Sequence, residues 1–162
     1  VAYTGWESFG KQFDLPLVHF IRIYKPAFFE RIGLRYVNIF SRRALELEGE
    51  PWRELIAAPY LGVLAEEDVD ERSARKCSVD VELNLDSTCR AKIHAGPGMV
   101  KQNAPNAPQD PEVKFILDLD LFMGGQIDPR MAAGGLETLH GHSTPLFQGA
   151  ITDKLHSALE PA

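Results

Sequence analysis

A run of β-branched and aromatic residues from Phe28 to Ser41, FFERIGLRYVNIFS, constrains the fold more than any other stretch of the chain. Alternate positions divide this run between two faces, and both faces carry apolar side chains. A strand that is apolar on both faces belongs inside a sheet rather than at its edge. Gly33 fits a point where another group comes close to the backbone. We therefore expect residues 28–41 to form the central strand of a sheet.

The clearest alternation in the chain predicts a β-hairpin over residues 77–96. Two alternating runs flank the polar connector 86–88, as in antiparallel strands joined by a short loop. Opposite residues share a face, so a three-residue loop is required to pair apolar Leu85 with Cys89. The same register sets charged groups opposite one another, which contributes roughly 0.2–1 kcal/mol for each opposite-charge pair. The expected pairs are Asn84 with Arg90, Glu82 with Lys92 and Asp80 with His94.

Two helices are expected to flank the strands. Apolar residues recur at helical spacing over residues 6–24 and again over 131–159. A proline inside a helix removes a backbone hydrogen bond, so Pro16 should kink or split the first helix and Pro145 should interrupt the second. A further alternating run over 113–122 predicts another strand.

The remaining segments are connections. Pro51, at a first helical position, predicts a short helix that Pro59 ends. Residues 96–112 carry four prolines and no apolar periodicity, which predicts a long, exposed and mobile loop. Successive strands without intervening helices favour antiparallel pairing. We expect an α+β fold in which an N-terminal helix and a long C-terminal helix cover an antiparallel sheet.

Length, charge and cysteine content restrict the function classes. The 162 residues fit a single α+β domain, 1–162. Because Val1 is not an initiator methionine, we expect the chain to be a fragment that lacks an upstream segment of a longer protein. A net charge of −6 argues against nucleic acid or an anionic membrane as a partner. No apolar run approaches the roughly 20 residues that span a bilayer. With two cysteines and no signal peptide, we expect a cytoplasmic protein whose thiols are free.

Two stretches resemble a known family. RIGLRYVN, from Arg31 to Asn38, and FQGAITDKL, from Phe147 to Leu155, are similar to segments of a sporadically distributed bacterial family of uncharacterised proteins. The resemblance covers nearly the whole chain and departs at Pro145, where the family has an unbroken helix. It implies the C-terminal portion of a longer cytoplasmic bacterial protein, and it implies no activity.

The residues that could carry catalysis or bind a metal each have a structural interpretation that accounts for them better. Acidic pairs on one strand could hold a metal or act as acid and base, but they are typical of a solvated sheet face. Histidines at i and i+2 of a helix point apart. Apart from adjacent basic residues, nothing near either cysteine in the sequence would lower the pKa of its thiol and activate it as a nucleophile. We expect no catalytic residue, no metal site and no cofactor. The residues considered are Asp80 and Glu82, Asp118 and Asp120, His140 and His142, and Cys77 and Cys89.

Arg31 and Arg35 are the most promising candidate site residues. They share one face of the first strand, about 13 Å apart at the rise of a β-strand. Their guanidinium groups, with Tyr36 beside them, could bind a phosphate or carboxylate ligand. The alternative is a structural ion pair, either with an acidic strand or with Asp153 of the C-terminal helix. Arg35 with Asp153 is the structural pair that we predict.

Two function classes remain open. The first is a non-enzymatic interaction or accessory module of a bacterial cytoplasmic protein, with a protein partner or a second copy bound at its sheet edge or long loop. The alternative is a small-molecule-binding or hydrolytic domain with a pocket between the sheet and the C-terminal helix. A sizeable apolar pocket with convergent polar groups would favour the alternative. A filled interface with an apolar patch exposed elsewhere would favour the first class, which we prefer because no catalytic constellation is found.

Overall fold

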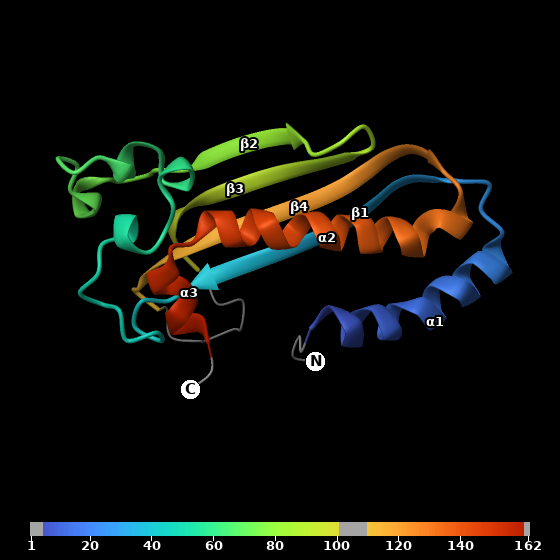
Figure 1. The fold of residues 1–162 in the computed structure, drawn as a ribbon, viewed down its shortest axis with the longest axis horizontal. Coiled ribbons are helices and arrows are strands. Elements are labelled where there is room, and N and C mark those ends of the chain that lie inside the picture. The colour runs from blue at the N-terminus through green and yellow to red at the C-terminus, as the bar shows by residue number, and fades with distance from the viewer. Residues whose placement is uncertain (1–4, 101–109, 161–162) are drawn as a thin grey trace.

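The computed structural model describes residues 5–100 and 110–160, and Figure 1 shows their arrangement. The chain forms an N-terminal helix, an antiparallel sheet and C-terminal helices, so the predicted α+β class is confirmed. The helices and strands are α1 (Trp6–Tyr24), β1 (Phe29–Phe40), β2 (Val79–Asn84), β3 (Cys89–Met99), β4 (Val113–Ile127), α2 (Ala132–Ala150) and α3 (Asp153–Leu159).

The four strands are ordered β1-β4-β3-β2, and all neighbours are antiparallel. The hairpin of β2 and β3 has the predicted register, with Asp80 opposite His94 and Glu82 opposite Lys92. Its loop is also as expected, because the amide of Leu85 donates to the carbonyl of Cys89 at 2.8 Å. Period-two alternation on both strands specified this register, since a slip of one residue would have exchanged the two faces.

The prediction that residues 28–41 form the central strand is wrong, because β1 lies at one edge of the sheet. The apolar residues on its two faces have different environments. Leu34 and Phe40 are buried on the side of the sheet that α2 covers. Val37 and Ile39, on the other side, are 51% and 45% exposed. The second apolar face of β1 is therefore partly exposed to solvent rather than buried. β4, not β1, is an interior strand of the sheet.

The hydrophobic core lies between the sheet and α2, which crosses one sheet face in Figure 1. Every second residue of β4 and β3 enters this core, and Cys89 is buried there as expected. The two cysteines are free thiols, as predicted. The fully buried side chains of the two central strands are Cys89, Ala91, Ala95, Phe115, Leu117, Leu119 and Leu121.

The first helix has the predicted bounds and Pro16 does not split it, but the break in the second helix is not where Pro145 predicted it. α2 runs through Pro145 as far as Ala150. The break comes at Ile151 and Thr152, whose backbone is extended. Tertiary hydrogen bonds hold this break: the amide of Thr152 donates to the carbonyl of Leu55 at 3.0 Å, and Ile151 forms a β-bridge with Ile56. The partners of these bonds are distant in sequence, so local proline rules could not locate the break.

The connections also differ from expectation. The short helix expected after Pro51 is a 3₁₀ turn, Trp52–Glu54, and Pro59 lies inside a second turn, Ala58–Tyr60. The expected loop over 96–112 begins later, because residues 96–99 continue β3 and pair with β4. Pro97 is tolerated there because β2 begins opposite Ala95, so that β4 is the one strand that pairs with β3 at Pro97 among the described residues. The rest of the expected loop falls largely on residues 101–109, outside the described ranges.

Candidate interaction site

In the part of the chain that the structure describes, no other strand pairs with the outer edge of β1. β1 has 12 residues, and within residues 5–100 and 110–160 its only strand partner is β4. Its pairing is regular from Arg31 to Phe40, with one irregularity between Phe29 and Arg31. Folded proteins normally shorten, bulge or cover such an edge, because its backbone groups can pair with another strand. A long regular edge is therefore a candidate binding surface.

Helix α1 lies beyond this edge rather than over the sheet (Figure 1). It has no buried residue, although it is strongly amphipathic. Aromatic contacts attach each of its two ends. At the start, the indole of Trp6 stacks on His140 of α2 with ring centroids 4.4 Å apart, and its Nε1 donates to Glu137 at 2.6 Å. Near the end, the ring of Phe20 lies 6.2 Å from that of Phe29. Apolar surface between these contacts remains exposed, including that of Phe13 at 39%.

An apolar groove separates α1 from the start of β1 and from α2. Its volume is about 480 Å³. The groove is bounded by aromatic and aliphatic side chains of all three elements, so it continues the edge of β1 into an apolar surface. Its lining residues include Phe13, Leu17 and Phe20 of α1, Phe29 and Ile32 of β1, and Ala132 and Leu136 of α2.

Both candidate arginines lie on the open face of the sheet and are neutralised by β4. Arg31 pairs with Asp120 at 2.8 Å, and Nε of Arg35 donates to Asp118 at 2.8 Å. The hydrogen bond to Asp118 raises the pKa of Arg35. Arg35 therefore bonds to an acidic strand and not to Asp153, which lies in the first turn of α3. The predicted Arg35–Asp153 pair is thus replaced by an Arg35–Asp118 pair.

Phe122 occupies the centre of the charged face. The guanidinium groups of Arg31 and Arg90 lie 4.6 and 4.9 Å from its ring centroid. Arg90 and Lys92 both approach Glu82 of β2 at 3.7 Å. The cations on this face thus already have carboxylate and aromatic partners, so the arrangement does not favour binding of an added anion.

Tyr36 points to the opposite face, so the structure does not bring it together with Arg31 and Arg35. Its hydroxyl lies 2.9 Å from Nδ1 of His140, beneath α2. Beside this contact is a cavity of about 220 Å³ between the sheet and the C-terminal helices, lined by Ser143 and Phe147 among others. The cavity lies where the alternative function class requires one, but drug-sized ligands occupy pockets of about 300–1,000 Å³.

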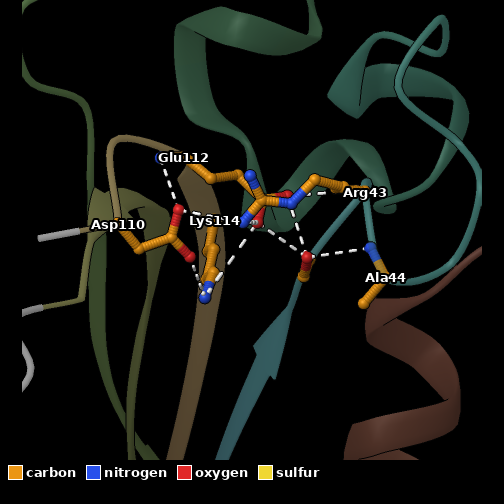
Figure 2. A network of polar contacts seen from close by, with 6 residues as sticks. Arg43, Ala44, Asp110, Glu112 and Lys114 are labelled. Carbon is orange, nitrogen blue, oxygen red and sulfur yellow. Dashed lines mark hydrogen bonds and ion pairs between the residues drawn. The ribbon is translucent and has the colours of Figure 1, made fainter. Parts of the chain in front are cut away.

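A shielded network of charges joins the chain after β1 to the start of β4 (Figure 2). Arg43 and Lys114 both pair with Asp110, at 3.0 and 2.9 Å. Lys114, the amide of Glu112 and Arg43 together lower the pKa of Asp110 to about 2. The hydroxyl of Ser41 donates to Glu112 at 2.7 Å. This network fastens the chain at the end of β1 to the start of β4.

The sequence predicted burial for the apolar face of α1, and its exposure was missed. Helical periodicity identifies which side of a helix is apolar, but it carries no signal for what covers that side. In the sequence, the open edge is indicated only by the apolar residues on the second face of β1, and these residues led to the prediction of a central strand.

Comparisons of the chain with protein-family models, curated proteins and solved structures find no match. In the described part of the chain, no helix has the length and apolar character needed to cross a membrane.

Proposed function

We propose that the protein is a non-enzymatic interaction module that pairs with a second copy of itself through the outer edge of β1. In this proposal it is an accessory part of a bacterial cytoplasmic protein, in keeping with the family that its RIGLRYVN and ITDKL stretches resemble. The observation that carries the proposal is the regular open edge of β1 beside an exposed apolar groove.

Addition of a strand would use both parts of this site, the edge of β1 and the apolar groove. Main-chain hydrogen bonds to an added strand supply affinity, and alternate side chains of that strand enter neighbouring pockets. A strand added to β1 would lie next to the groove beneath α1, where Phe13 is 39% exposed. Docking there would bury apolar surface that the single chain leaves exposed, at about 25 cal/mol per Å².

A second copy is the occupant that the charges and symmetry support. Two β1 edges can pair antiparallel about a two-fold axis, which closes the assembly with one interface. Arg31 and Arg35 are the basic residues on the outer face of β1, and each is already paired with an aspartate of its own chain. Two edges can therefore approach without bringing uncompensated cations together.

The test is the mass of the purified protein in solution, measured by light scattering after size-exclusion chromatography. We expect a dimer for the wild type and a monomer for the double variant Val37→Lys/Ile39→Lys, which places charges beside the edge. Both positions are about half exposed, so the fold of the single chain should survive. Val63→Lys is the matched control, because Val63 is 58% exposed and lies in a 3₁₀ turn away from β1. A monomeric wild type, or a dimer that persists in the double variant, would contradict the proposal.

The alternative class, a small-molecule-binding or hydrolytic domain, has weaker support. Its cavity at Tyr36 and His140 is below the usual size of a ligand pocket. Ser143, the serine that lines that cavity, donates to the carbonyl of His140 rather than to an imidazole nitrogen. A serine without a base to accept its proton is not an activated nucleophile.

A further inference from the structure

Three side chains that can ligate metals converge where the hairpin tip meets α2. Asp86 lies in the loop between β2 and β3, Cys89 is the first residue of β3, and His142 comes from α2. One ligating atom from each residue lies within 4.8 Å of the other two. Oδ2 of Asp86 and Nε2 of His142 are 2.8 Å apart. These residues lie on elements 56 positions apart in sequence, so the tertiary fold is what brings them together.

The hairpin loop holds Asp86 in a defined orientation. Its Oδ1 accepts from the amides of Thr88 and Cys89 at 2.6 and 2.7 Å. The other carboxylate oxygen is thereby directed at His142, and the sulfur of Cys89 lies at the base of the cluster. Cys89 is fully buried, whereas the side chains of Asp86 and His142 are 37% and 31% exposed. The cluster is therefore closed on its sulfur side and open to water on the side of the carboxylate and the imidazole.

The spacing of these atoms is close to that of a tetrahedral site. Zinc bonds of about 2.0–2.1 Å to nitrogen and oxygen, and 2.3 Å to sulfur, place neighbouring ligand atoms roughly 3.3–3.6 Å apart. A separation of 2.8 Å and an upper limit of 4.8 Å lie on either side of that range. Side-chain adjustments of about 1 Å would bring all three atoms to bonding distance, with no displacement of a backbone element.

We propose that Asp86, Cys89 and His142 form a zinc site that ties the β2–β3 hairpin to α2. A thiolate, an imidazole and a carboxylate are the ligands that zinc accepts in proteins, and a mixed set with sulfur disfavours magnesium and calcium. Binding releases the thiol proton of Cys89 to solvent, and water completes the fourth position on the exposed side.

The probe is zinc alone, titrated into the purified, tag-free protein in competition with a chromogenic chelator. We expect one zinc per chain, and binding weaker by more than about tenfold in His142→Gln, since even the loss of outer-shell partners costs 10–100-fold. His94→Gln is the matched control, because His94 also hydrogen-bonds an aspartate, Asp80, at 2.7 Å but stands outside the cluster. Circular dichroism should show the same fold for both variants, since both histidines are on the surface.

Cobalt(II) tests the sulfur ligand separately. The wild-type cobalt complex should show an intense thiolate-to-metal absorption band, which Cys77→Ser retains and Cys89→Ser loses. Because Cys89 is buried and its serine variant can unfold, the wild-type spectrum and His142→Gln are sufficient on their own. Zinc affinity equal in wild type and His142→Gln, or a wild-type cobalt complex without a thiolate band, would overturn the proposal. Both measurements are independent of dimer formation, so the proposal stands or fails separately from pairing through β1.

Discussion

Along β4, successive side chains alternate between a sheet face that α2 covers and a face that is open to solvent. On the covered face, Leu117, Leu119 and Leu121 are completely buried. On the open face, Asp118 and Asp120 form ion pairs with arginines of β1 that are 62% and 49% exposed. The two faces share one backbone but differ in the type of interaction that stabilises them.

Magnitudes decide which face carries the stability of the fold. Burying a leucine contributes about 1.5–3 kcal/mol, whereas an exposed ion pair contributes about 0–1 kcal/mol. The covered face therefore holds the strands together. The ion pairs of the open face contribute little to the stability of the fold. Four experiments break or sharpen this contrast.

Leu119→Ala should have the largest effect. It removes a fully buried side chain from the middle of the covered face and leaves a cavity. We expect the free energy of unfolding in urea to fall by about 2–5 kcal/mol. Leu15→Ala is the control, because Leu15 of α1 is 64% exposed and its loss should change stability by less than about 0.5 kcal/mol. Equal effects at the two positions would remove the contrast between covered and exposed apolar residues.

Gly96→Ala tests a point where backbone covers the outer face of β3. A Cβ at Gly96 would lie 2.5 Å from the carbonyl oxygen of Cys77, and backbone cannot move aside as a flexible side chain can. We expect a loss of about 1–3 kcal/mol in thermal or urea unfolding. Gly141→Ala in α2 should have the opposite sign, a gain of about 0.5–1 kcal/mol, because a Cβ there meets nothing within 4 Å. A neutral Gly96→Ala would mean that the outer face is open there too.

Asp110→Asn tests a carboxylate that, unlike those of the open face, is largely shielded from solvent. The carboxylate of Asp110 is 15% exposed and its pKa is lowered to about 2 by its bonds to Lys114, the amide of Glu112 and Arg43. A lowered pKa in the folded state means that the charged form stabilises the fold above about pH 4, and that this contribution is lost as the pH falls through about 2. We expect the variant to melt at a lower temperature at pH 7, and the gap to the wild type to close between about pH 4 and pH 2. A gap that is constant over this range would contradict the assignment.

Arg35 and Asp118 should show the smallest effect. A double-mutant cycle with Arg35→Ala and Asp118→Ala is expected to give a coupling energy of about 0.2–1 kcal/mol, because the pair is open to water and screened by salt. The matching cycle of Arg35→Ala with Asp153→Ala should be additive. Coupling of several kcal/mol in the first cycle would show that the open face stabilises the fold as strongly as the core does.

The parts of the fold that sequence predicts well are those set by near neighbours. The hairpin register followed from alternation on both sides of residues 86–88, and the observed pairs match it. Alternation reports which face is buried, but it does not report how many strands lie beside a strand, so β1 was misplaced. The break at Ile151 depends on hydrogen bonds to residues near 55, and no local pattern contains that information.

For the candidate arginine site, the sequence predicted the kind of residue involved but not its partners. Arg31 and Arg35 were identified as groups needing an anionic partner, and an acidic strand was one of two options. Choosing Asp118 over Asp153 requires the register between β1 and β4, which joins residues far apart in the chain. Tyr36 was placed with the arginines because it is adjacent in sequence, although adjacent residues of a strand point to opposite faces.

The position of β1 also has a consequence for the order of folding. Asp80 and His94 of the hairpin are 14 residues apart in sequence, whereas Arg35 and Asp118 are 83 apart. Closing the longer loop costs more chain entropy and is repaid only when many contacts form together, so high contact order slows that step. We expect pulse-labelling hydrogen exchange to protect amides of β2 and β3 before those of β1. In that interval β4 would be the transient edge of a three-stranded sheet, ready to accept β1 from its own chain or from another.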